Sequence, residues 1–210
     1  MSFVVGIFYW EAVLSDKRCA EVARKTSETD IQLSLNLDGS GESRIETGVG
    51  FFDHMLTHIA KHGLFDLNVA VTGDLHIDDH HTVEDVGIAL GKAFAEALGD
   101  RAGIVRVGNV SVPMDEALVY CAIDISGRGF LAYDLVCTTP KLGDFTTELV
   151  PEFFRAVAVN AGRTVHLKQW DGTNTHHIIE SAFKAFGRAA AQSVKLDPRV
   201  KGIPSTKGVL

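Results

Sequence analysis

An internal repeat is the feature that most constrains the fold of this 210-residue chain. Two long segments, His80–Leu98 and His176–Val194, read HHTVEDVGIALGKAFAEAL and HHIIESAFKAFGRAAAQSV. Both begin with two histidines, place a glutamate four residues after the first histidine, and later carry a glycine followed by a cation. Self-similarity on this scale indicates that one structural unit has been duplicated.

The match extends beyond these two segments in the same order. Upstream, IQLSLNLDGSG parallels VYCAIDISGRG, and FFDHMLTHI parallels PEFFRAVAV. Downstream, LGDRAGI resembles LDPRVKGI. Chance can align two helices, but it rarely aligns a strand, two helices and an exit loop in one order. We therefore interpret the chain as two copies of one unit.

Each unit is predicted to contain a strand, a strand, a helix, a strand and a helix. In the first unit, strands are expected over Ile31–Leu37 and Leu67–Thr72, and helices over Phe52–His62 and Asp79–Leu98. We expect Asp53 to cap the first helix and Gly99 to end the second. The predicted class is α+β, with two tandem homologous α/β repeats, each a mostly antiparallel sheet with helices on one face, packed as one compact body.

The expected boundaries are 1–25 for an N-terminal extension, 26–112 for the first repeat and 113–210 for the second. Within the extension, Phe3–Leu14 is apolar but lacks the basic region of a signal peptide. It is also too short to span a bilayer, so no membrane association is expected. We interpret this segment as an extension or an early helix.

Composition narrows the partners and the compartment. Hydrophobic residues make up 46% of the chain and charged residues 22%, as in a globular protein with a core. The formal net charge of -7 argues against nucleic acid as a partner. Cys19, Cys121 and Cys137 are widely spaced and form no disulfide pattern, which indicates a cytoplasmic setting.

The paired histidines point to metal chemistry. In a helix, residues four apart share a face, whereas adjacent residues diverge by about 100°. His80 can therefore share an ion with Glu84, and His176 with Glu180, while the second histidine of each pair points elsewhere. One such motif alone could be a packed or surface histidine pair, but its recurrence in both units favours ligation. The pattern predicts two ions, each bound by one pair.

The second histidines, His81 and His177, are expected to complete these sites. The simplest arrangement adds His177 to the His80 pair and His81 to the His176 pair. A neighbouring subunit would supply the missing ligand where the faces within one chain point apart. Imidazole binds zinc, iron, manganese and nickel, and carboxylates shift the preference toward manganese. No cysteine lies in either motif, which removes one reason to expect structural zinc.

At these residues the sequence resembles the imidazoleglycerol-phosphate dehydratase family, over about Arg24–Leu210. The motifs that carry the resemblance are RKTSETDI, GVGFFDHML, GDLHIDDHHTVED, PMDEAL, SGRG, HHIIESAFKAF and IPSTKG. Each motif alone is weak, whereas their combination is specific. The resemblance implies two manganese ions per chain and closed homo-oligomers of 24 chains, in which metals join smaller trimers.

The resemblance also implies a set of site residues. The implied metal ligands are His54, His80, His81, Glu84, Glu152, His176, His177 and Glu180. Glu152 matches His54 in the repeat and stands where some plant members have a histidine. The implied substrate-binding residues are Glu28, His54, His80, Arg106, Arg128, His176, Lys184, Ser205 and Lys207. Those implied to bind the phosphate are Arg106, Arg128, Lys184, Ser205 and Lys207. Glu28 and Glu180 are the candidates for proton transfer, and Glu28 is favoured because Glu180 is also an implied ligand.

The implied reaction is the dehydration of imidazoleglycerol phosphate, a phosphorylated imidazole, to a keto phosphate in histidine biosynthesis. The hydrogen that leaves sits on an unactivated carbon, so two manganese ions are expected to hold the ring as an imidazolate, whose electron density expels the hydroxyl. Two alternatives stay open: a non-catalytic protein that metals assemble, and a metal-dependent phosphohydrolase. The chain contains no GxGxxG or GxxxxGK[ST] motif, so no nucleotide cofactor is expected.

Overall fold

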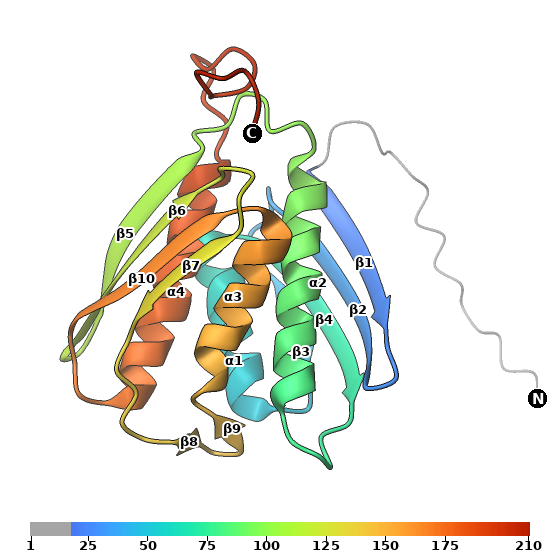
Figure 1. The fold of residues 1–210 in the computed structure, drawn as a ribbon, viewed down its shortest axis with the longest axis vertical. Helices are drawn as coiled ribbons and strands as arrows, with labels where there is room; N and C mark the ends of the chain where they lie inside the picture. Colours follow the sequence, from blue (N-terminus) through green and yellow to red (C-terminus); the bar gives the residue numbers. More distant parts are fainter. Residues whose placement is uncertain (1–17) are drawn as a thin grey trace, which may run out of the picture.

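Two four-stranded sheets enclose four helices in the computed structural model of this chain, which describes residues 18–210 (Figure 1). The first unit consists of β1 (Cys19–Lys25), β2 (Thr29–Asn36), β3 (Ser43–Glu46), α1 (Gly50–Gly63), β4 (Asp66–Gly73) and α2 (His80–Leu98). The second consists of β5 (Val107–Met114), β6 (Ala117–Asp124), β7 (Phe130–Asp134), β8 (Lys141–Leu142), β9 (Phe145–Thr146), α3 (Leu149–Ala161), β10 (Thr164–Asp171) and α4 (Thr175–Val194).

The two units share one topology, which confirms the predicted duplication and the α+β class. The strand orders are β1-β2-β4-β3 and β5-β6-β10-β7, and in each sheet only the last pair is parallel. Each unit has one strand more before its first helix than the sequence pattern predicted. The second unit also inserts the short β8–β9 hairpin before α3.

The predicted unit boundaries were wrong by several residues. β1 pairs with β2 along its whole length, from Cys19 opposite Asn36 to Lys25 opposite Asp30, so it belongs to the first sheet and not to an extension. Likewise, β5 starts at Val107 and pairs with β6, so the second unit begins before residue 113. Both are edge strands, and pairing with the neighbouring strand of the sheet defines them. Residues 1–17 of the predicted extension lie outside the described part of the chain.

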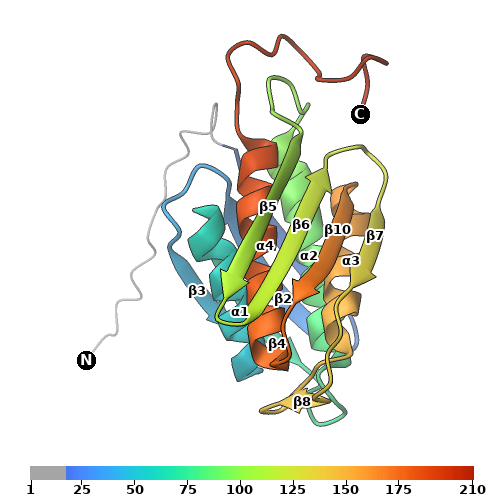
Figure 2. The same ribbon diagram turned by 90° about the vertical axis from the view of Figure 1, so that its left-hand side faces the viewer.

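The helices fill the space between the sheets because each sheet has one apolar face. In β2, Ile31, Leu33 and Leu35 are buried and alternate with more exposed polar residues, as a half-buried strand requires. α2 packs on β1 and β2 and against α3, whereas α4 packs on β5 and β6 and against α1. Figure 2 looks onto the second sheet, with the helices behind it. Among residues 18–210, no helix is long and apolar enough to cross a membrane.

Glycines let the helices approach closely at equivalent points of the two units. A Cβ at Gly187 of α4 would lie 2.8 Å from the carbonyl oxygen of Ile59 in α1. A Cβ at Gly91 of α2 would lie 2.8 Å from the carbonyl oxygen of Val157 in α3. The repeated glycine thus brings α4 onto α1 and α2 onto α3 in the same way.

The helix ends agree with the sequence prediction at some residues and differ at others. Asp79 and Gly99 flank α2 as predicted, but the Asp79 carboxylate accepts a hydrogen bond from the amide of Thr146 (2.9 Å), in β9. The prediction that Asp53 caps α1 was wrong, because Val49 occupies the N-cap position. Asp53 lies in the first turn and accepts from the Thr47 amide (2.9 Å), so its carboxylate closes the loop that leads into the helix.

Candidate metal centre

The crossing of α1 and α4 gathers histidines around one glutamate, Glu180. One carboxylate oxygen, Oε2, lies 3.0 Å from His176 Nε2 and 3.3 Å from His54 Nε2. The other, Oε1, lies 3.1 Å from His58 Nε2 and 2.6 Å from Lys184 Nζ. His176, Glu180 and Lys184 follow one another at intervals of four on α4, and His54 and His58 do so on α1, so helix periodicity presents both sets along one seam.

Burial and charge set the protonation of this cluster. The Glu180 side chain is only 7% exposed, and burial alone raises its pKa, but hydrogen bonds from Lys184 and His176 outweigh burial and lower the pKa to about 2. Burial is also the main influence that lowers the pKa of His58 to about 4. At neutral pH, Glu180 is therefore an anion and His58 is neutral, which are the forms that bind metal cations.

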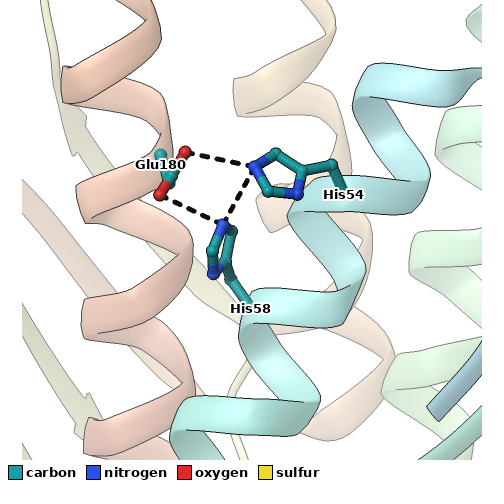
Figure 3. Close-up of side chains that lie close together, drawn as sticks. All are labelled: His54, His58 and Glu180. Atoms are coloured by element: carbon teal, nitrogen blue, oxygen red, sulfur yellow. Dashed lines mark hydrogen bonds and ion pairs between the residues drawn. The ribbon is translucent and has the colours of Figure 1, made fainter.

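The spacing of these side chains fits a divalent cation. Two ligands at right angles, each about 2.1–2.2 Å from an ion, are about 3 Å apart. The separations within the trio are 3.2 Å between the Nε2 atoms of His54 and His58, 3.3 Å from His54 to Glu180 and 3.1 Å from His58 to Glu180 (Figure 3). Two imidazoles and one carboxylate that converge from one side are a known ligand set for first-row divalent metals.

His58 is a candidate ligand that the sequence analysis missed. It stands four residues after His54 in HMLTH, so the i,i+4 rule that was applied to α2 and α4 also reaches it. Its side chain is 14% exposed, and its ring packs between those of His54 and His62, with centroids 4.4 and 5.6 Å away. Unlike the HH motifs, this pair has no glutamate of its own on α1. Its carboxylate partner is Glu180, on α4.

The second histidines of the HH pairs do not join this cluster. His81 Nδ1 lies 2.9 Å from Asp74 Oδ2, and His81 Nε2 lies 3.7 Å from Glu28 Oε1. His177 Nδ1 lies 2.7 Å from Glu116 Oε2. The hydrogen bond from its acid partner raises the pKa of each of these two imidazoles above the ordinary value.

The equivalent position between α2 and α3 is more exposed to solvent. His80 Nε2 lies 3.9 Å from Glu84 Oε2, and both side chains are nearly half exposed. Glu152 forms an ion pair with Arg155, one turn later on α3. Glu152 and His54 each precede by ten residues the left-handed residue that ends their helix, Gly162 and Leu64, so the predicted equivalence of Glu152 and His54 is a structural one.

Four of the five residues predicted to bind phosphate lie at the far end of α4. Arg106 forms an ion pair with Asp124 (2.8 Å) and donates to the Pro204 carbonyl (2.9 Å), which places the tail with Ser205 and Lys207 beside it. The tail also passes the turn that carries Arg128, since a Cβ at Gly127 would lie 2.7 Å from the Leu210 carbonyl carbon. Of the predicted phosphate-binding residues, only Lys184 lies at Glu180.

This group and the Glu180 cluster are far apart within one chain. The Arg106 amide donates to the Ser193 carbonyl (2.8 Å), and Ser193 is thirteen residues beyond Glu180 on α4. At 1.5 Å per residue, that is about 20 Å along the helix. One small substrate cannot contact both groups in the same chain.

The chain is thus a duplicated α+β body with a histidine–carboxylate cluster between two of its helices, and comparison with known proteins gives its class of activity. The sequence profile of imidazoleglycerol-phosphate dehydratase matches residues 47–190. The chain belongs to the imidazoleglycerol-phosphate dehydratase family, and it is an enzyme, a hydro-lyase of histidine biosynthesis.

Individual relatives cover nearly the whole chain. The dehydratase of Desulforamulus reducens is 61% identical over 193 residues, which span 92% of this chain and 98% of the relative. That of Acetivibrio thermocellus is 62% identical over 190 residues, or 90% and 97% of the two chains. The crystal structure of the Staphylococcus aureus dehydratase has a TM-score of 0.78 at 41% identity, covering 85% of this chain and 99% of that one. The Pyrococcus furiosus enzyme, in complex with (S)-C348, has a TM-score of 0.78 at 37% identity, covering 90% and 100%.

Proposed function

We propose that this enzyme dehydrates imidazoleglycerol phosphate with two divalent cations, manganese by preference, at sites that are completed between chains. The observation that carries the proposal is the convergence of His54, His58 and His176 on the carboxylate of Glu180 in the α1–α4 seam. A cation bound by Glu180 and two of these imidazoles would keep coordination positions for a further protein ligand and for substrate. A Lewis-acidic cation at this point would polarise the imidazole ring of the substrate.

The missing ligand of each site is proposed to come from another chain. His81 lies on α2, which packs against α3, whereas Glu180 lies on α4, which packs against α1. The same separation holds between His177 and the His80–Glu84 pair. Each chain would therefore contribute one half-site from each repeat, and a second chain would contribute His81 or His177.

The phosphate group of the substrate is proposed to bind between chains in the same way. Arg106, Arg128, Ser205 and Lys207 would bind it from one chain, and Lys184 from the chain that supplies Glu180. This arrangement is supported by the separation of the two groups, about 20 Å along α4. A single phosphate group is too small to contact both of them in one chain. Charge-assisted hydrogen bonds from several cations would hold the phosphate firmly.

Glu28 is the residue proposed to move the proton. It sits in the β1–β2 turn with its side chain 48% exposed, and 3.7 Å separates its carboxylate from His81 Nε2. Glu180 is a poorer candidate, because His54, His58, His176 and Lys184 already surround its two oxygens. A carboxylate that reaches a bound substrate while remaining free to exchange protons suits general acid–base catalysis.

The test is a product assay on protein stripped with a chelator and then supplied with manganese. We expect a keto phosphate to form from imidazoleglycerol phosphate only after manganese is added, with no release of inorganic phosphate. Elemental analysis of protein purified without chelator should find two ions per chain. Free phosphate as the product would indicate a phosphohydrolase instead, and full activity in verified metal-free protein would contradict the metal assignment.

A further inference from the structure

The two HH pairs share a feature that the proposed ligand set does not explain. In each pair the second histidine points its Nδ1 atom at a carboxylate, Asp74 for His81 (2.9 Å) and Glu116 for His177 (2.7 Å). An imidazole that donates from Nδ1 keeps its proton there, so its Nε2 atom is left with a lone pair. A carboxylate on the far nitrogen also fixes the plane of the ring.

Among residues 18–210, no hydrogen bond reaches the opposite edge of either ring, so each Nε2 atom can accept a cation. His81 Nε2 is 3.7 Å from Glu28, and His177 Nε2 is 3.9 Å from Asp115, both longer than a hydrogen bond. Nearby acids at these distances make the Nε2 side electrostatically favourable for a cation without occupying the nitrogen. Each ring is thus held on one side and open on the other.

Duplication alone does not account for the two acids, because they come from different elements. Asp74 follows β4, whereas Glu116 lies in the β5–β6 turn. The residue equivalent to Glu116 in the first unit is Glu28, since each immediately precedes the second strand of its sheet. Glu28 faces Nε2 of His81, while Glu116 holds Nδ1 of His177. The two units therefore reach the same Nδ1 contact by separate routes, and the first unit keeps its hairpin glutamate at the open edge of the ring.

The burial of Asp74 also indicates that this carboxylate has a specific role. Its side chain is 18% exposed, and its other oxygen, Oδ1, is buried without a hydrogen-bond partner among the described residues. A buried oxygen with no partner is unfavourable for folding. A carboxylate at this position is accounted for by its contact with His81.

We infer that Asp74 and Glu116 are positioning residues, each of which orients one histidine, His81 or His177, toward a different cation. This inference rests on the proposed function, in which those two histidines complete the two metal sites. The acids act through the histidines and do not touch the metal or the substrate. Outer carboxylates of this kind typically change metal affinity by about 10- to 100-fold.

The experiment is a manganese-binding titration on the chelator-stripped full chain, followed by electron paramagnetic resonance of the free ion. Asp74→Ala should weaken one of the two sites by about 10- to 100-fold and leave the other unchanged. Combined with His81→Ala, it should cause no further loss, because the residue through which it acts is gone. Combined with His177→Ala, its effect should add. Glu116→Ala should show the reverse pattern.

Matched variants separate positioning from a general structural role. Asp134→Ala removes a carboxylate that pairs with Lys168 (3.5 Å) on the outer edge of the second sheet, and it should leave both affinities unchanged. Asp74→Asn and Glu116→Gln keep the shape and an acceptor oxygen, so each should assemble and show a smaller loss than the alanine variant. An Asp74→Ala loss that is equal with and without His81, or no loss at all while wild type binds two ions, would overturn the inference. If wild type binds no manganese, the metal sites themselves are wrong, and the inference falls with them.

Discussion

At the α1–α4 seam, the two carboxylate oxygens of Glu180 contact different side chains. Lys184 and His58 approach Oε1, while His54 and His176 approach Oε2. A fixed cation on Oε1 keeps the carboxylate ionised and in one orientation. Glu180 is consequently suited to holding a cation, and Glu28, in an exposed turn, is suited to exchanging protons.

This division leads to a prediction for Glu28→Gln. The variant should retain manganese and substrate affinity, because the amide preserves the shape of the side chain and Glu28 is not among the proposed ligands. Its turnover number should fall by about 10²–10⁴-fold, the usual contribution of a general acid–base group. Steady-state kinetics together with a binding titration would measure both. Near-normal turnover would return Glu28 to the status of a surface carboxylate.

A second prediction concerns pH and His58. Burial lowers the pKa of His58 from an ordinary 6.5 to about 4, so between these values the unfolded chain binds more protons at this residue than the folded chain. The folded state is then destabilised as the pH falls. From pH 7 to pH 5.5, metal-free wild type should lose about 1 kcal/mol more stability than His58→Gln, which cannot titrate. Urea unfolding at both pH values measures the difference, and equal losses in the two proteins would contradict it.

At the scale of helices, the geometry of the site depends on how closely two helices cross. Gly187 permits α4 to contact the backbone of α1 at Ile59, the residue after His58, so the seam depends on a residue without a side chain. Gly91 does the same for α2 and α3. The distance between the histidines of one helix and the glutamate of the other is therefore set by backbone contact at the crossing.

We accordingly predict that Gly187→Ala destabilises the protein by roughly 1–2 kcal/mol. Overpacking against a backbone oxygen costs about 1–3 kcal/mol, and the better helix propensity of alanine offsets at most about 1 kcal/mol of that. Displacement of α1 should also weaken manganese binding at the Glu180 site. Gly50→Ala is the control, because nothing lies within 4 Å of a Cβ at Gly50. Thermal unfolding and a metal titration would test both variants, and equal behaviour would show that the crossing tolerates a methyl group.

At the scale of the whole molecule, the residues of each proposed site are spread over separate places in one chain. The Glu180 cluster and the Arg106 group lie at opposite ends of α4, and His81 lies on a helix that packs elsewhere. Repeated identical interfaces tend to close into symmetric particles. These separations support the proposed sharing of sites between chains, and the expected number of 24 chains rests on the family resemblance alone.

Removal of metal should therefore change particle size. We predict that a chelator converts the assembly into smaller inactive oligomers, and that manganese restores both size and activity. Light scattering with and without chelator provides the measurement, and magnesium at the same concentration is the control for ionic strength. A particle that keeps its size after verified metal removal would show that other contacts hold it together.

Shared sites also predict complementation between two inactive variants. His176→Ala removes a ligand from the Glu180 cluster, and Arg106→Ala removes a cation from the distant phosphate group. Each should be inactive or nearly so alone. Co-expressed in mixed assemblies, they should regain activity at roughly one quarter of the sites, where each neighbour supplies its intact half. No recovery in verified mixed particles would mean that one chain forms a whole site.

The repeated motifs were sufficient to predict the duplication. Hydrophobic periodicity along the sequence was sufficient to predict the class of fold and most helix and strand positions. Alternation in Ile31–Leu37 and the apolar period of the segment that became α2 depend only on neighbouring residues, so they can be read along the chain. The i,i+4 pairs of histidine and glutamate are equally local. Edge strands such as β1 escaped prediction, because a strand with few large apolar residues is defined by its hydrogen-bonded neighbour.

Contacts between elements were decided by the tertiary structure alone. The approach of His58 to Glu180 depends on how α1 crosses α4, and the contact of Asp74 with His81 depends on where β4 ends relative to α2. The separation of Arg106 from Glu180 likewise follows from the length of α4. Secondary structure follows from periodicity within a few residues, whereas the meeting of side chains distant in sequence follows from packing, which a linear pattern does not encode.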